Sequence, residues 1–290
     1  MEYAIEVKGL TKHYPDFTLD QVSFQIPTGT IVGFIGENGA GKTTTIKALL
    51  NLIHPEEGEI RLLGKENGGA DKKLKEQIGV VLDTSYFPDN LKIPHINRIM
   101  QQMYRNWETE TFLEYCRRFR LPEKKTVKEF SRGMKMKLSI SVALSHHTKL
   151  LILDEATSGL DPVVRSEILD IFLEFIQEED HTVFLSSHIT SDIEKIADYI
   201  LLIHEGNILL YEEKDALLYE YGLARCSEEQ FARLNTDQIV GVRRNRFEVE
   251  ALVKNREELK EQFPDLILDP VTIEDILLYL VKQPAKSREE

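Results

Sequence analysis

The stretch GENGAGKTT at residues 36–44 constrains the fold more than any other part of the chain. It matches the pattern G-x-x-x-x-G-K-[ST], follows the apolar run IVGFI and precedes TTTIKALLNLI, which has helical spacing. Glycines let the backbone turn so that its N–H groups face phosphate oxygens, and the following helix directs its positive dipole end at them. The sequence therefore predicts a strand, a phosphate-binding loop and a helix, with Lys42 neutralising the outer phosphates of a nucleotide.

The segment LLILDEATSGLD at residues 150–161 supplies acidic side chains for the same site. The apolar residues before Asp154 predict a buried strand whose carboxyl end emerges beside the phosphate loop. Asp154 would hold Mg²⁺ through water, and the hydroxyl of Thr43 would ligate the same ion. Glu155 follows directly and is the candidate general base, because a carboxylate beside the γ-phosphate can polarise the attacking water. An isolated Asp-Glu pair at a strand end is common, so this interpretation depends on the phosphate loop.

Hydrophobic periodicity divides the chain into regions of different predicted secondary structure. Alternating apolar runs between Ala4 and Ile35 predict strands, and IGVVL at residues 78–82 is another short strand. Helical spacing dominates residues 96–146, whereas LLILD, TVFLSS and YILLIH predict buried parallel strands separated by helices. This alternation favours an α/β layered core. Short helix and strand pieces follow residue 213 and indicate a small accessory domain.

Composition excludes several classes of partner. The chain has 290 residues, of which 42% are hydrophobic, enough for a sizeable core. Its net charge of -13 would repel nucleic acid, so binding DNA or RNA would need a local basic patch. The candidate patch is VRRNR at residues 242–246, between two strand-like runs, and a solvated hairpin turn is the preferred interpretation. We therefore expect no nucleic-acid partner.

Cysteine usage and hydropathy bear on the compartment. Cys116 and Cys226 are far apart and form neither a CxxC pair nor a disulfide framework, which favours a reducing compartment. The N-terminus lacks the pattern of a signal peptide, and no apolar run approaches the roughly 18 residues that span a bilayer. We expect the chain to be soluble by itself, so that any membrane role must come through a partner.

With these two motifs and the SSH that ends at His188, the chain resembles the ATP-binding cassette (ABC) family of transporters, over about residues 1–212. In that family a signature usually written LSGGQ opens a helix and binds the γ-phosphate of ATP held by a second cassette. FSRGM matches it here: Ser131 and Gly133 are kept, whereas Arg132 replaces the first glycine and Met134 replaces the glutamine. A serine hydroxyl and a glycine N–H at a helix N-terminus can form an anion site, so the resemblance implies a dimer of cassettes.

The resemblance also assigns roles to individual residues. Catalysis falls to Glu155 and His188, the latter as the switch histidine beside the γ-phosphate, and communication across the dimer falls to Asp161. His146 and His147 match no motif and are expected at the surface or at a helix end. The implied site residues are, for ATP, Tyr14 (stacked on adenine), Gly36, Glu37, Asn38, Gly39, Ala40, Gly41, Lys42, Thr43 and Thr44; for the signature in trans, Ser131, Arg132, Gly133 and Met134; for Mg²⁺, Thr43, Asp83 and Asp154.

Two positions depart from the family's pattern near the nucleotide. Asp83 stands where the family usually has a glutamine that touches Mg²⁺ and water, and Ala156 stands where a proline is usual. Asp83 could make turnover more dependent on Mg²⁺, and an Asp83→Gln variant with an unchanged Mg²⁺ requirement would count against this; a solvated aspartate without metal contact is the alternative. We expect little effect from Ala156. Because Lys42, Asp154, Glu155 and His188 are all present, the sequence predicts ATP hydrolysis and not binding alone.

The implied fold is an α/β P-loop NTPase, the ABC nucleotide-binding domain, over residues 1–212. It comprises a RecA-like core, an antiparallel β subdomain and a helical subdomain at about residues 84–148. Residues 213–290 would form a small α/β C-terminal accessory domain.

The implied function is that of the ATP-binding and ATP-hydrolysing subunit of a bacterial ABC exporter. Two cassettes, as a homodimer or heterodimer, would work with separate transmembrane permease subunits at the cytoplasmic face of the membrane. Residues 86–104 would form the docking surface for the permease. The signature and the TIEDILLYLV tail are similar to those of ABC-2-type systems, which makes a peptide or an antibiotic the candidate cargo.

Other functions of the same superfamily remain open. A soluble ATP-dependent switch of the translation or DNA-repair type is the main alternative. The presence of a single cassette and the short segment between Lys42 and Ser131 count against it. A regulator whose accessory domain binds a ligand or a protein is a further alternative, and that domain could equally help the cassettes to dimerise. The cargo, the permease and the composition of the dimer are not specified by the sequence.

Overall fold

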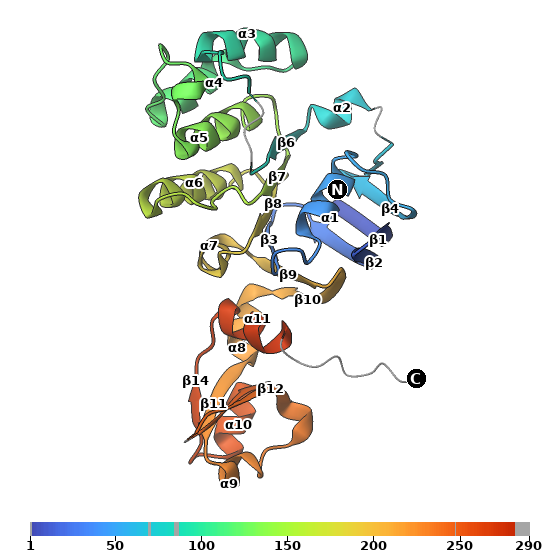
Figure 1. Ribbon diagram of the computed structural model, residues 1–290, viewed down its shortest axis with the longest axis vertical. Helices are drawn as coiled ribbons and strands as arrows, with labels where there is room; N and C mark the ends of the chain where they lie inside the picture. Colours follow the sequence, from blue (N-terminus) through green and yellow to red (C-terminus); the bar gives the residue numbers. More distant parts are fainter. Residues whose placement is uncertain (1, 69–70, 84–86, 247, 282–290) are drawn as a thin grey trace.

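The structure is a computed structural model that describes residues 2–68, 71–83, 87–246 and 248–281. Its elements follow one another along the long axis of the molecule, with a helical part at one end, two sheets in the middle and a third sheet at the other end (Figure 1). No helix in the described part of the chain is long and apolar enough to cross a bilayer.

The central layer is a six-stranded sheet. Its strands pair in parallel except at one edge, where β10 runs antiparallel to β9. The inner strands β3, β8 and β7 are buried on both faces, because helices and a second sheet cover them. In spatial order the strands are β10 (Asn207–Glu213), β9 (Tyr199–His204), β3 (Ile31–Ile35), β8 (Thr182–Ser187), β7 (Leu150–Asp154) and β6 (Ile78–Val81).

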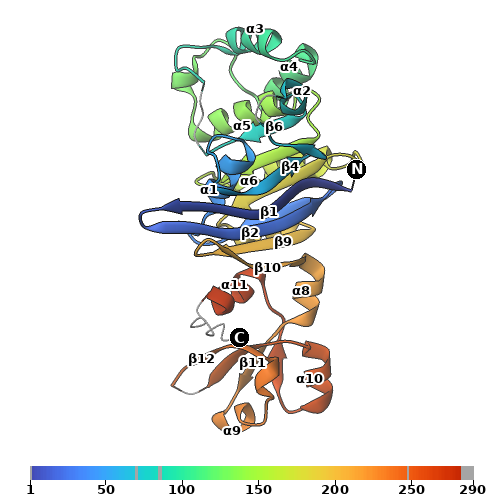
Figure 2. The same ribbon diagram turned by 90° about the vertical axis from the view of Figure 1, so that its right-hand side faces the viewer.

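An antiparallel sheet packs on one face of this layer, as Figure 2 shows. The ring of Phe184 on β8 stacks on Phe34 of β3, with centroids 5.2 Å apart, and on Phe24 of the antiparallel sheet at 5.9 Å. These aromatic contacts join the two sheets through one apolar core. In spatial order the strands are β2 (Phe17–Pro27), β1 (Tyr3–Tyr14), β4 (Glu57–Leu62) and β5 (Lys65–Glu66).

Helices cover the other face and extend beyond the edge strand β6 (Figure 1). Their apolar sides share one large core with the inner strands, in which Phe112 and Phe172 are fully buried. These helices are α3 (Ile93–Met103), α4 (Thr109–Arg118), η1 (Val127–Glu129), α5 (Arg132–Ala143), α6 (Pro162–Phe175) and α7 (Thr190–Ile196). The other two helices of the cassette, α1 (Lys42–Leu49) and α2 (Lys72–Lys75), pack into the core on the side of the antiparallel sheet.

The C-terminal part has its own antiparallel sheet, with the strand order β12 (Ile239–Arg244), β13 (Val249–Val253), β11 (Gly222–Cys226) and β14 (Ile267–Asp269). The last helix, α11, returns to the cassette and packs on α7, where Ile273 and Ile276 are buried. The helices of this part are α8 (Lys214–Glu220), α9 (Glu228–Phe231), η2 (Thr236–Gln238), α10 (Arg256–Gln262) and α11 (Ile273–Val281). The division of the chain after residue 212 stays a prediction; the last strand of the large sheet ends at Glu213.

Most expected strands are present, but two features differ from expectation. The sequence analysis did not predict β4, because its residues EGEIRL are mostly exposed and show no apolar alternation. His146 lies just after α5, which fits the expectation of a surface or helix-end residue, but it is buried and not at the surface. Its ring is 1% exposed, stacks on Tyr104 at 4.1 Å and contacts the carbonyl of Glu76 at 2.9 Å.

The VRRNR segment adopts the expected hairpin. Arg244 at the end of β12 pairs with Val249 at the start of β13, and the N–H of Asn245 donates to the carbonyl of Glu248 at 2.9 Å. The guanidinium of Arg244 contacts Glu228 at 3.1 Å, so part of the positive charge of this segment is already neutralised.

Candidate nucleotide site

The phosphate loop connects β3 to α1 at the carboxyl edge of the large sheet. A Cβ on Gly36 would lie 2.3 Å from the carbonyl oxygen of Ile203, and Gly41 has a φ of 117°, so the turn needs glycine at both positions. Because α1 begins directly at Lys42, its first N–H groups and its positive dipole end face the loop. The local sequence thus forms the anion-binding turn that it predicts.

Lys42 is only 6% exposed and lies over the loop. Its Nζ donates to the carbonyl oxygens of Gly36 at 2.6 Å and Glu37 at 3.1 Å, and lies 3.8 Å from Oε1 of Glu155. Burial lowers the pKa of Lys42, against the opposing effect of the nearby carboxylates of Glu155 and Asp154. The ammonium group is thus held where a phosphate chain on the loop would meet it.

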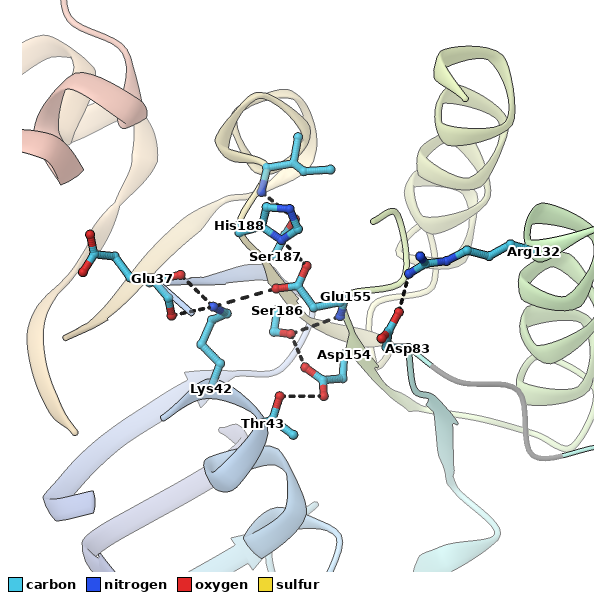
Figure 3. Close-up of polar contacts among 12 residues, drawn as sticks. Glu37, Lys42, Thr43, Asp83, Arg132, Asp154, Glu155, Ser186, Ser187 and His188 are labelled. Atoms are coloured by element: carbon cyan, nitrogen blue, oxygen red, sulfur yellow. Dashed lines mark hydrogen bonds and ion pairs between the residues drawn. The ribbon is translucent and has the colours of Figure 1, made fainter. Parts of the chain in front are cut away.

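Asp154 is held by two hydroxyl groups from neighbouring elements (Figure 3). Its Oδ2 accepts from Oγ1 of Thr43 on α1 at 3.0 Å, and its Oδ1 accepts from Oγ of Ser186 on β8 at 2.6 Å. These bonds fix the carboxylate beside the start of α1. A carboxylate and a hydroxyl are the oxygen ligands that Mg²⁺ prefers, so this pair fits the ion in its donor chemistry.

Glu155 follows at the end of β7 with a φ of 53°, a left-handed conformation that non-glycine residues seldom adopt. Its N–H lies within hydrogen-bonding distance of both the carbonyl and the hydroxyl of Ser186, at 3.1 and 3.2 Å, which holds this conformation in place. Its Oε2 contacts Nδ1 of His188 at 2.6 Å, while Oε1 points toward Lys42 (Figure 3). A carboxylate, an imidazole and a buried ammonium thus meet at one point.

These groups face a cavity of about 640 Å³. Tyr14, at the end of β1, is 41% exposed at its rim and lies beside Phe17, with ring centroids 6.4 Å apart. The cavity therefore offers an aromatic surface at one end and a phosphate-binding loop at the other. Its lining residues are Tyr14, Phe17, Glu37, Asn38, Gly39, Gly41, Lys42, Thr43, Thr44, Lys47, Ile53, Asp83, Glu155, Ser158 and His188.

Comparison with known proteins agrees with this geometry. The family model described as ABC transporter matches residues 19–158. The chain is 36% identical over 213 residues to the bacitracin transport ATP-binding protein BcrA of Enterococcus faecalis, covering 72% of this chain and 69% of the relative. The chain belongs to the ABC transporter family of ATP-binding proteins. It is accordingly an ABC ATPase, the ATP-binding and ATP-hydrolysing subunit of a transporter.

Other relatives and solved structures agree with this assignment. The lantibiotic transport ATP-binding protein SrtF of Streptococcus pyogenes is 36% identical over 208 residues, covering 71% of this chain and 89% of the relative. A solved ATP-binding subunit of an ABC transporter has a TM-score of 0.66 at 26% identity, covering 81% of this chain and 96% of that one. An ATP-binding cassette solved as a dimer with ADP and Pi has a TM-score of 0.64 at 20% identity, covering 72% and 98%, and shares the fold.

The signature of this ABC ATPase lies apart from its own nucleotide cavity. Ser131 caps the N-terminus of α5, and its Oγ accepts from the N–H of Met134 at 3.2 Å. Asp161 caps α6 in the same way, accepting from the N–H of Val164 at 3.1 Å. Within the described part of the chain, neither Ser131 to Met134 nor Asp161 lines the cavity. These two helix starts therefore lie outside the lining of the cavity, unlike Lys42, Thr43, Glu155 and His188.

One residue of the site, Ser186, and one ion pair at its edge were not predicted from the sequence. Ser186 was quoted only as part of the SSH motif, yet it holds both Asp154 and the backbone of Glu155. Two serines at the end of an otherwise apolar strand could have signalled it, because buried hydroxyls need partners. Asp83 lines the cavity, and its carboxylate binds the guanidinium of Arg132, with Nη2 and Oδ1 2.5 Å apart. Its contact with Mg²⁺ stays a prediction.

Proposed function

We propose that this ABC ATPase powers the export of a peptide or antibiotic through a separate transmembrane permease, by ATP-driven closure of two cassettes. The observation that carries the proposal is an exposed apolar groove in a cassette that also carries the hydrolytic side chains Lys42, Asp154, Glu155 and His188. The names of the relatives, which transport bacitracin and lantibiotics, support the class of cargo. The subunit would act at the cytoplasmic face of the membrane, bound to its permease.

The chain's own residues perform the chemistry. The loop from Gly36 to Gly41 and the ammonium group of Lys42 bind the phosphates, and Tyr14 stacks on the base. Glu155 accepts a proton from the attacking water, while His188 orients the carboxylate. Thr43 and Asp154 would hold Mg²⁺, which supplies neutralising charge at the phosphates.

A second cassette supplies the residues that close the site over the γ-phosphate. Ser131 and the N–H of Gly133 stand at the start of α5, where a helix dipole favours an anion. A second copy that faces this start with its phosphate loop would place its γ-phosphate against the hydroxyl of Ser131. Because the hydrolytic residues and the signature are both present in this chain, a homodimer with two active sites satisfies the chemistry.

The groove lies between the core and the helical part of the cassette. A cavity of about 500 Å³ is lined mainly by apolar side chains of α1, β4, β6 and their loops, and by Tyr104. Leu52 is 61% exposed on one side of it, and Met103 at the end of α3 is 65% exposed beside Tyr104. A short amphipathic helix from a cytoplasmic loop of the permease suits this surface. Tyr86, the first residue of the expected docking stretch, lies outside the described residues.

The proposal is tested by isolating the tagged protein from native membranes in mild detergent. We expect a polytopic membrane protein to be recovered in stoichiometric amount, and Leu52→Asp or Met103→Asp to release it. Ile267→Asp is the matched control, because Ile267 is 62% exposed on the C-terminal sheet, far from the groove. Recovery with ribosomes or chromatin proteins alone would overturn the proposal in favour of a soluble switch.

The cargo is tested in cells. A strain that carries Glu155→Gln should lose resistance to the exported compound while the complex with the permease persists. A panel of bacitracin and lantibiotics is the probe to use, and equal resistance of both strains to all of them would contradict the peptide or antibiotic assignment.

A further inference from the structure

Two departures from the family's pattern meet in the structure. Asp83 follows β6, and Arg132 opens α5, 49 residues later. Nη2 of Arg132 lies 2.5 Å from Oδ1 of Asp83, and the two side chains are 51% and 50% exposed (Figure 3). An acidic residue at the first position is therefore matched by a basic residue at the second.

The guanidinium of Arg132 also lies close to a third element. It lies against Gly159 in the loop between β7 and α6, where an added Cβ would come within 2.7 Å of Nη1. Gly159 has a φ of +67°, so both its backbone and its missing side chain suit this close approach. This loop begins at Glu155 and ends at Asp161, which places Arg132 between a wall of the nucleotide cavity and the loop that leaves the catalytic glutamate.

The start of α5 also packs against α6. A Cβ at Gly133 would meet Val164 on α6 at 3.4 Å, so the first turn of α5 packs closely on the first turn of α6. Asp83 adds the link to the cavity, since it lines the same space as Thr43 and Glu155.

We infer that Arg132 is a positioning residue: through Asp83 it couples the occupancy of this chain's nucleotide cavity to the orientation of the signature that the chain offers to a second cassette. The inference rests on the proposed role of Ser131 in trans. Phosphates entering the cavity repel the carboxylate of Asp83, and the guanidinium offsets that charge while it holds α5 in register. Without the arginine, Asp83 opposes ATP; without the aspartate, the arginine no longer ties α5 to the cavity.

The exposure of both side chains argues against a structural role for this pair. Half-exposed ion pairs contribute little to stability, because water screens them and long side chains lose entropy when they pair. Loss of this pair should therefore leave the melting temperature nearly unchanged. Its effect should appear where two cassettes must be aligned on ATP.

The experiment is a double-mutant cycle in a Glu155→Gln background, with ATP-driven dimerisation measured by analytical ultracentrifugation. Asp83→Ala and Arg132→Ala should each weaken the dimer by about three- to tenfold, and the double variant should be no weaker than either single variant. The exchanged pair, Asp83→Arg with Arg132→Asp, should recover part of the loss. Additive losses, or an Arg132→Ala dimer as tight as the parent, would overturn the inference.

Arg118 and Glu174 form a matched control pair. Their atoms approach to 2.5 Å, their exposures are 45% and 55%, and they join α4 to α6 away from the cavity. Arg118→Ala and Glu174→Ala should leave ATP-driven dimerisation unchanged. If the Arg118–Glu174 cycle showed the same coupling energy as the Asp83–Arg132 cycle, any surface ion pair in the helical part would affect dimerisation. The specific role of Arg132 would then be wrong.

Two further variants separate this inference from its neighbours. Ser131→Arg should abolish ATP-driven dimerisation. If it does not, both the role of the signature in trans and this inference are wrong. If the losses of dimer affinity at residues 83 and 132 are additive, only this inference is wrong. If Asp83 binds Mg²⁺ instead, Asp83→Asn will shift the Mg²⁺ concentration that dimerisation requires. That shift will then be the same whether residue 132 is arginine or alanine. A shift that depends on residue 132 supports the pair.

Discussion

Between residues 2 and 213 the structure buries polar side chains among apolar strands, Lys42, Asp154 and Ser186 among them. The described residues from 214 to 281 bury only apolar or aromatic side chains and the thiol of Cys226. Burying a polar group costs free energy unless it finds a partner. Lys42, Asp154 and Ser186 find theirs around the nucleotide site, whereas others, such as His146, find theirs elsewhere in the cassette. No charged side chain is buried among the described residues of the C-terminal part, so its core serves packing alone.

The two regions nevertheless share one core, to which α8, β11, β13 and the last helix contribute buried side chains. α11 belongs to the C-terminal part in sequence, but Ile273 and Ile276 pack into the main core against α7, and the N–H of Ile273 donates to Glu194 on α7 at 3.1 Å. Leu277 of α11 and His188 line one cavity of about 490 Å³ at the other side of the phosphate loop. The chemistry therefore lies in the cassette, while the C-terminal part braces the helix that follows His188.

The largest expected effect lies in the cassette. Glu155→Gln should lower kcat by about 10²- to 10⁴-fold, because the amide cannot accept the proton of the attacking water. ATP binding should persist, since Lys42 and the loop are unchanged. Single-turnover hydrolysis and equilibrium binding of ATP are the measurements to make.

The matched control is Glu178→Gln, an exposed glutamate in the turn after α6. It should hydrolyse ATP at the parent rate. If Glu155→Gln retained substantial activity, the assignment of the general base would be wrong.

The packing of α11 on α7 should show the next largest effect of substitution. Ile276 is 2% exposed, so Ile276→Asp would bury a carboxylate against α7 and cost about 3 kcal/mol or more. Because the damage falls on the contact between the regions, urea unfolding should change from one transition to two, with the C-terminal part unfolding first.

Leu278→Asp provides the comparison on the same helix, since Leu278 is 41% exposed. It should change the unfolding free energy by less than about 1 kcal/mol. A single transition shifted as a whole in Ile276→Asp would show that the two regions unfold as one unit even without this packing.

The same contrast explains how much the sequence could predict. Lys42 and Glu155 belong to motifs whose residue types and spacing follow from phosphate chemistry, so their place beside one cavity could be predicted. The pairing of Asp83 with Arg132 could not, because 49 residues separate them and neither position shows periodicity. β4 was missed since an exposed strand lacks the alternation that burial imposes. The return of α11 onto α7 depends on tertiary packing, which no local pattern encodes.

The two cysteines report on each region separately. Burial raises the pKa of Cys116 in the helical part to about 12, and burial also raises the pKa of Cys226 in the C-terminal sheet. The thiolate is the reactive form, so below these pKa values alkylation requires local opening of the fold. Cys226 lies in the smaller core, and it should react faster than Cys116 by on the order of tenfold in mild urea.

Mass spectrometry of iodoacetamide adducts at pH 8 to 10 measures both rates in one sample. Over that range an exposed thiol would speed up as it ionises near pH 8.5, whereas Cys116 should remain slow until the fold opens. Faster labelling of Cys116 would reverse the order of stability that the two cores imply.

The smallest expected effect lies at the rim of the nucleotide cavity. Tyr14 is 41% exposed and packs beside Phe17, so its removal should leave the fold intact. Stacking of an aromatic ring on a base is worth about 1–3 kcal/mol, and at this exposed rim we expect the low end of that range. Tyr14→Ala should therefore weaken ATP binding by about fivefold with kcat little changed. Tyr14→Phe should bind like the parent, because the ring face and not the hydroxyl makes the contact. If Tyr14→Phe bound ATP as weakly as Tyr14→Ala, the hydroxyl and not the ring would make the contact. The rim would then recognise the nucleotide by a polar contact, as the rest of this cavity does.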